Sequence, residues 1–141
     1  MDISIRQHLR KQVVPMWQYA NLNPMGKSVG DCTVRAIAIA TGSAWVDTYL
    51  DLCLTGMLMA DMPSSNAVST AYLKKKGFKR RTIPDDCPDC YTIDDFCKDH
   101  PNGTYVIGTG SHLTAVIDGC LLDSWDSRNE CPVYYFEREE E

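Results

Sequence analysis

The sequence predicts an α+β domain in which N-terminal helices pack on a C-terminal antiparallel sheet. Apolar residues recur at helical spacing before residue 77, and short runs of β-branched and aromatic residues follow it. An Asp-Gly pair at 118–119 separates two of those runs, which is the pattern of a tight hairpin. Helices first and strands second is the order typical of the α+β class.

The helices of the first half are predicted from the breakers and caps at their ends. A proline ends the first helix, glycines end the second and the fourth, and serines can cap the third and the fourth. The predicted helices are residues 3–13 before Pro15, a buried helix in 31–42 that ends at Gly42, a helix capped by Ser43 that carries Trp45 to Leu58, and one opened by Pro63-Ser64-Ser65 that Gly77 terminates.

The second half reads as strands with one intervening helix. Thr92 can cap that helix while Asp95 answers three residues later, which is the pattern of a capping box. The strands are marked by their β-branched and aromatic content. The predicted elements are strands at 105–107, 112–117, 120–125 and 133–136, and a helix from Thr92 to Asp99.

The Asp118-Gly119 pair also fixes which residues face one another. Both residues suit the positive φ angles of a type I′ turn, and a two-residue loop sets the register of the strands that it joins. Because side chains alternate between the two faces, His112 and Asp123 then lie on one face as diagonal neighbours. The facing pairs in this register are Ile117 with Cys120, Thr114 with Asp123, and His112 with Trp125.

Composition limits the classes of function. A chain of 141 residues is expected to form one domain. Its 14 Lys and Arg against 19 Asp and Glu give a net charge of -5, which repels the phosphate backbone of nucleic acid. No apolar run reaches the ~18 residues of a membrane span, and the charged opening segment does not resemble a signal peptide. We therefore expect a cytoplasmic protein whose partners include neither nucleic acid nor membrane.

Cys32 is the cysteine best placed to act as a nucleophile. It follows Gly30-Asp31 at the start of the apolar helix, where free N–H groups and the positive end of the helix dipole lower the pKa of a thiol. A neighbouring imidazole would complete a thiolate–imidazolium pair, and the backbone N–H of Cys32 can donate to a developing oxyanion. His112 and Asp123 on one face of the hairpin supply a base and an orienting carboxylate.

This order of residues resembles that of the papain-like cysteine peptidases. In addition, Asp123-Ser124-Trp125-Asp126 is similar to that family's Asn-Ser-Trp-Gly, in which the first residue orients the catalytic His and the Trp shields that contact. The resemblance implies a compact papain-like fold with Cys32 as nucleophile, His112 as general base and acid, Asp123 as orienter and Trp125 as shield. Together with Gly30-Asp31-Cys32, the string is similar to small papain-like proteins of bacterial and prophage origin.

The sequence departs from the family at the oxyanion hole. The family's Gln, six residues before the Cys, would fall on Gly26, which has no side chain. Gln18, Asn21 or Asn23 could supply the missing donor, and we favour Asn23 because it lies in the turn before the helix. Asp in place of Asn as the orienting residue is chemically acceptable.

The expected function is hydrolysis of a peptide or isopeptide bond in a protein or peptide substrate, through a thioester on Cys32 and without a cofactor. Deamidation and acyl transfer use the same three residues and stay open, because they differ only in leaving group and acceptor. The alternative from another class is a non-catalytic interaction module in which Cys32 is a core residue. The sequence leaves the substrate and the oligomeric state open.

A second group of residues has the spacing of a structural zinc site. Cys87-Pro88-Asp89-Cys90 forms a Cys-x2-Cys knuckle, and Cys97 and His100 would lie one turn apart on the predicted helix. The knuckle region 87–100 is therefore a possible zinc site. The alternative is that Cys97 is a core residue beside Phe96 and that the knuckle holds two reduced thiols.

Overall fold

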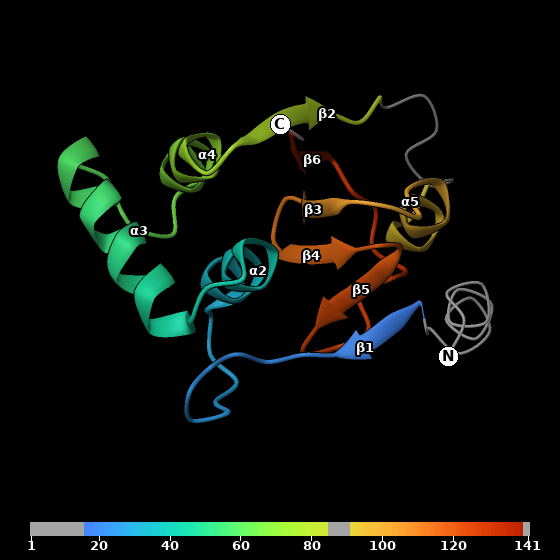
Figure 1. Cartoon of the computed structure of the whole chain (residues 1–141), viewed down its shortest axis with the longest axis horizontal. Helices are drawn as coiled ribbons and strands as arrows, with labels where there is room; N and C mark the ends of the chain where they lie inside the picture. The colour runs from blue at the N-terminus through green and yellow to red at the C-terminus, as the bar shows by residue number, and fades with distance from the viewer. Residues whose placement is uncertain (1–15, 85–90, 140–141) are drawn as a thin grey trace, which may run out of the picture.

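A six-stranded mixed sheet, with strand order β1-β5-β4-β3-β6-β2, runs through the centre of the molecule (Figure 1). The computed structural model describes residues 16–84 and 91–139, so the helix predicted at 3–13 lies outside the described residues. The α+β class is confirmed. The strands are β1 (Trp17–Tyr19), β2 (Phe78–Thr82), β3 (Thr104–Gly108), β4 (Leu113–Ile117), β5 (Cys120–Asp123) and β6 (Tyr134–Arg138).

The helices divide between the two faces of the sheet. The helices are α2 (Cys32–Thr41), α3 (Trp45–Met59), α4 (Asn66–Lys75) and α5 (Ile93–Asp99). Consecutive residues of β3 enter different cores, as the period of a strand requires. Val106 packs in the cluster of α2 and α4, whereas Ile107 packs in the cluster of α5. None of the helices in the described ranges has the length and apolar character needed to traverse a lipid bilayer.

The predicted caps are confirmed in two of three helices. Ser65 Oγ accepts a hydrogen bond from the N–H of Val68 at the start of α4. Thr92 and Asp95 form the reciprocal capping box at the start of α5. The cap predicted at Ser43 is wrong, because α3 starts one residue later, after Ala44, and the Ser43 hydroxyl accepts a hydrogen bond from Thr41 instead.

The hairpin between β4 and β5 has the predicted turn and register. Asp118 and Gly119 have φ angles of 51° and 78°, the positive values of a type I′ turn. The facing pairs are Ile117 with Cys120, Val116 with Leu121, and Ala115 with Leu122. This register is confirmed, and it brings the residue before β4 and the last residue of β5 to the same end of the sheet.

The sheet differs from the prediction at its two edges. β1 was not predicted and runs parallel to β5, so the sheet is mixed rather than purely antiparallel. β2 was not predicted either, and it pairs antiparallel with β6. A strand of three residues shows no alternation, and the polar surface of β2 leaves only Phe78 buried. Neither edge strand therefore carries the hydrophobic pattern that predicts a strand.

Candidate active site

Cys32 and His112 come together where the first turn of α2 meets the entrance to β4. Cys32 is the first residue of α2, and His112 directly precedes β4, the strand against which that helix packs. Both side chains are partly buried. The hydrogen bond to His112 lowers the pKa of the Cys32 thiol below its ordinary value, and this effect outweighs the opposing effect of burial. The structure thus brings together the predicted nucleophile and base.

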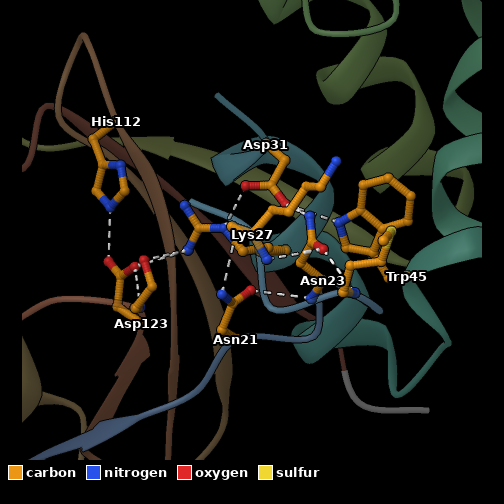
Figure 2. A network of polar contacts seen from close by, with 10 residues as sticks. Asn21, Asn23, Lys27, Asp31, Trp45, His112 and Asp123 are labelled. Atoms are coloured by element: carbon orange, nitrogen blue, oxygen red, sulfur yellow. Dashed lines mark hydrogen bonds and ion pairs between the residues drawn. The ribbon is translucent and has the colours of Figure 1, made fainter. Parts of the chain in front are cut away.

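His112 is held in turn by Asp123. Its Nε2 lies 2.7 Å from Oδ2 of Asp123, whose carboxylate is buried (Figure 2). Burial opposes the charged form of the imidazole, but the hydrogen bonds to Asp123 and Cys32 raise the pKa of His112 to about 9. Because Nε2 faces the carboxylate, Nδ1 is the ring nitrogen left for the thiol. This geometry favours a thiolate on Cys32 and an imidazolium on His112.

Trp125 covers one side of this contact. Its ring lies 5.0 Å from the imidazole of His112, at an angle of 45° between the ring planes. The indole remains 43% exposed, so it forms an outer wall of the site rather than part of the core. Trp125 therefore lies where the predicted shield would be.

Asp123 accepts hydrogen bonds from three further groups. Ser127 Oγ donates to Oδ2 at 2.9 Å, and Arg35 Nη1 donates to Oδ1 at 3.2 Å. The N–H of Ser124 also donates to Oδ1, at 2.7 Å. Although burial acts in the opposite direction, the hydrogen bond from His112, assisted by that backbone N–H, holds the pKa of the Asp123 carboxyl below its ordinary value. The carboxylate therefore remains charged and orients the imidazole.

A buried ion network extends from Asp123 to the start of α2. Arg35 Nε donates to Oδ1 of Asp31 at 2.7 Å, and both side chains are less than one tenth exposed. Oδ2 of Asp31 accepts from Trp45 Nε1 at 3.0 Å and from Asn23 Nδ2 at 3.1 Å. Figure 2 shows this network running from Asp123 across to Asp31. One guanidinium thus links α2 to the end of β5.

Arg35 and Ser127 were not predicted as parts of the site. A signal for Arg35 was present, because it is the one charged residue in the helix Cys32–Thr41 and follows Asp31 at the i,i+4 spacing of an ion pair. Its contact with Asp123 spans 88 positions and follows only from the folded sheet. Ser127 lies in the segment after β5, where the hairpin register no longer applies.

The polar residues before Cys32 shape the turn that precedes α2. The amide nitrogen of Asn23 donates to Asp31, and its Oδ1 accepts from the N–H groups of Met25 and Lys27. Asn21 Oδ1 accepts from the N–H of Asn23. Gln18 aligns with Leu122 and so lies on the opposite face of the sheet from Asp123. The role of Asn23 as oxyanion donor stays a prediction.

The first turn of α2 offers another donor for an oxyanion. Asp31 is the N-cap residue, but its side chain makes no capping hydrogen bond and binds Arg35 instead. The leading N–H groups of α2, that of Cys32 included, are therefore left without a capping side chain. An uncapped helix start next to a nucleophile can stabilise negative charge on a substrate oxygen.

The described part of the predicted zinc site has the character of a core. Cys87 and Cys90 lie outside the described residues, and within the described ranges no group of three His, Cys, Asp or Glu side chains is arranged to hold a metal. Burial raises the pKa of the Cys97 thiol to about 12. His100 Nδ1 lies 2.9 Å from the carbonyl oxygen of Phe96, and the two rings stack. Because Cys87 and Cys90 lie outside the described residues, zinc stays a prediction.

A surface hollow of about 570 Å³ lies between α4 and β2. Its lining includes Lys74, Phe78, Arg80 and Phe136 but none of Cys32, His112 and Asp123.

Comparison of the chain with protein-family models, with curated proteins and with solved structures gave no match. The class of the site is therefore defined by its own geometry, a thiol, an imidazole and a carboxylate arranged in series.

Proposed function

We propose that the protein is a papain-like cysteine hydrolase that cleaves a peptide or isopeptide bond. The observation that carries this proposal is the position of His112, which contacts Asp123 through Nε2 and lowers the pKa of the Cys32 thiol. An imidazole placed between a thiol and a carboxylate is the arrangement that activates a sulfur nucleophile.

In the proposed reaction, Sγ of the Cys32 thiolate attacks the carbonyl carbon of the substrate and forms a C–S bond. The oxyanion that develops is stabilised by the uncapped N–H groups at the start of α2. The His112 imidazolium gives its proton to the leaving amine nitrogen, and the C–N bond breaks to leave a thioester. Water then attacks the thioester, His112 accepts the proton of that water, and the C–S bond breaks to release the acid.

Asp123 orients the imidazole throughout this cycle and stays ionised. Arg35 and Ser127 support that role, because each donates a hydrogen bond to one oxygen of the carboxylate. The same attack by Cys32 would serve deamidation if ammonia left, or acyl transfer if an amine replaced water. The choice among these reactions depends on the substrate, and peptide or isopeptide hydrolysis is the one that the papain-like arrangement favours.

We place this activity in the cytoplasm. Five cysteines within the described residues are free thiols, namely Cys32, Cys53, Cys97, Cys120 and Cys131. Free thiols persist in a reducing compartment, where a nucleophilic cysteine also stays active.

The proposal is tested by alkylation of each cysteine with iodoacetamide between about pH 5 and 9, with the modified peptides quantified by mass spectrometry. Cys32 should react at a pH well below that required by an ordinary thiol of pKa ~8.5. His112→Ala should remove this advantage. The matched control is His100→Ala, which removes the other described histidine and should leave the rate at Cys32 unchanged.

Two results would contradict the proposal. Protection of Cys32 until the protein unfolds would make it a core residue and favour the interaction module. Equal reactivity of Cys32 in the wild type and in His112→Ala would mean that the imidazole does not activate the thiol.

A further inference from the structure

α3 presents a continuous apolar face to solvent. It packs on α2 and α4 at the margin of the molecule, away from the sheet (Figure 1). Its buried residues Thr48, Leu52 and Gly56 follow one another at intervals of four and mark the inner face. The opposite face of such a helix meets solvent and is ordinarily polar. It instead carries Val46, Tyr49, Leu50, Leu54, Met57 and Leu58, all of them exposed.

The spacing of these six residues places them on a single stripe. They recur at the i, i+3, i+4, i+8, i+11 and i+12 positions, which is the period of one helix face. Exposure rises to 68% at Met57 and 77% at Leu58. Soluble monomers rarely leave so large a contiguous apolar patch uncovered, so the stripe has the character of an interface.

The charges of α3 favour a protein partner over a membrane. Its two charged residues are Asp47 and Asp51, and the carboxylate of Asp51 accepts a hydrogen bond from Tyr72 of α4. Helices that lie on membranes carry Lys and Arg on their polar face. A helix with only acidic residues, in a chain of net charge -5, would be repelled by an anionic bilayer.

The exposed area fits a second copy of the same chain. The six residues are each between 46% and 77% exposed and together offer on the order of 700 Å² of accessible surface, an upper limit on what this face can bury that approaches the roughly 800 Å² each partner contributes to an interface of standard size. The one charged residue within the stripe is Asp47, in the first turn of α3. In an antiparallel pair the two Asp47 carboxylates lie at opposite ends of the interface, so no like charges meet and the stripe is complementary to itself. Self-complementary patches are what a two-fold dimer requires.

We propose that the protein is a homodimer in which the exposed stripe of α3 packs against the same stripe of a second copy, with the two helices antiparallel. The inference is independent of the proposed hydrolase activity. Cys53 lies at the middle of α3, between Leu50 and Leu54, and is partly exposed. In an antiparallel pair the helix centres meet at the two-fold axis, so the two Cys53 thiols lie near each other.

The test combines light scattering with cross-linking. Light scattering on the purified full chain should give twice the mass of one chain at micromolar concentrations. A short bismaleimide should join Cys53 to Cys53, as identified by mass spectrometry of the linked peptides. Cys131, which is exposed but lies far from the stripe in sequence, is the internal control for random collisions. Preferential linkage at Cys53 is the expected result.

Leu54→Lys should weaken dimerisation at least roughly 100-fold, because the two-fold axis places two lysines in one apolar interface. Leu58→Lys is the second variant. Met25→Lys adds the same charge at an exposed apolar residue of the loop before α2 and should leave the mass unchanged. Circular dichroism of each variant checks that the monomer is folded.

A wild-type chain that stays monomeric at all concentrations would overturn the proposal. So would a folded Leu54→Lys dimer of unchanged affinity, or cross-linking at Cys131 that equals that at Cys53. A monomer that cosediments with phosphatidylcholine vesicles, and loses that binding in Leu54→Lys, would assign the stripe to a lipid surface instead.

Discussion

The molecule holds two cysteine–histidine regions of similar composition and opposite character. Cys32 and His112 meet at the end of the sheet, where their contact lowers the pKa of the thiol and helps to raise that of the imidazole. Cys97 lies on α5, where burial raises the pKa of its thiol, and His100 directly follows that helix, with its imidazole stacked on Phe96. Two residue types alone therefore do not make a nucleophile.

The difference comes from a carboxylate. Asp123 lies 2.7 Å from His112, and it is itself neutralised by Arg35. His100 has a backbone carbonyl of Phe96 as its partner, which supplies a dipole but no charge. A buried thiolate forms only where the protein provides a compensating cation, and a buried cation needs an anion in turn. The comparison thus predicts that loss of a charge lowers stability most around Cys32 and His112. Loss of packing should lower it most around Cys97 and His100.

The largest effect is expected from Arg35→Met. It leaves the buried carboxylate of Asp31 without a cation and takes one donor from Asp123, which keeps His112, and this should lower the free energy of unfolding by about 3–5 kcal/mol. Urea unfolding measures this loss. The matched control is Arg128→Met, which removes a partly exposed ion pair with Asp126 and should cost about 0–1 kcal/mol. Equal losses in the two variants would mean that the buried network adds no more than a surface pair.

Cys97→Ser should destabilise the protein more than Cys32→Ser does. Cys97 is 1% exposed in an apolar cluster, so its replacement buries a hydroxyl at a cost of about 1–3 kcal/mol. Cys32 is partly exposed and polar on one side, and its replacement should cost less than about 1 kcal/mol. Thermal unfolding of both variants compares them directly. The reverse order would indicate that Cys32 is the structural thiol.

Ser127→Ala should lower the free energy of unfolding by a smaller amount, through the contacts of Asp123 with His112. It removes one hydrogen bond to Asp123 but leaves those from His112 and Arg35, so the expected loss is about 0.5–1.5 kcal/mol. Because a carboxylate with one donor fewer is a stronger acceptor for the imidazolium, the pKa of His112 should rise, and NMR titration of the imidazole measures this. An unchanged His112 titration would show that Ser127 has no part in holding the charge.

The smallest effect is expected in the pH dependence of stability. Cys32→Ser leaves Asp123 to raise the pKa of His112, so the imidazolium stabilises this variant fully below pH 6.5. This contribution is lost as the pH rises through the raised pKa of His112. The Cys32 thiol is absent from both variants because its lowered pKa would make stability increase with pH, which is the opposite dependence. Urea unfolding from pH 5 to 9 should show the difference between Cys32→Ser and the double variant with His112→Gln shrinking with pH. A constant difference would contradict the charged pair.

The parts of the fold that were predictable are those determined by neighbours in sequence. The turn at Asp118-Gly119 fixed the register that brings His112 to Asp123, and the box of Thr92 and Asp95 fixed the start of α5. The α+β class followed from helical spacing of apolar residues before residue 77 and strand-like runs after it. Ser43 failed as a cap because a helix start one residue later made its hydroxyl redundant.

The parts that were not predictable depend on contacts distant in sequence. β1 becomes a strand only because β5 is beside it, and its three residues show no pattern of their own. The i,i+4 spacing of Arg35 indicates a pair with Asp31, but its contact with Asp123 exists only in the folded sheet. The same limit applies to the exposed face of α3, whose apolar residues read as core in a sequence. Which atoms would hold an oxyanion stays a prediction.

The spacing of the charge network along the chain has a consequence for biosynthesis. Cys32 leaves the ribosome about 80 residues before His112, and a synthesis rate of roughly 5–20 residues per second makes this an interval of about 4–16 s. During that interval the thiol has no imidazole beside it, so it behaves as an ordinary cysteine. The lowered pKa of the Cys32 thiol therefore arises only after β4 and β5 have been synthesised and have paired, because it depends on the hydrogen bond to His112.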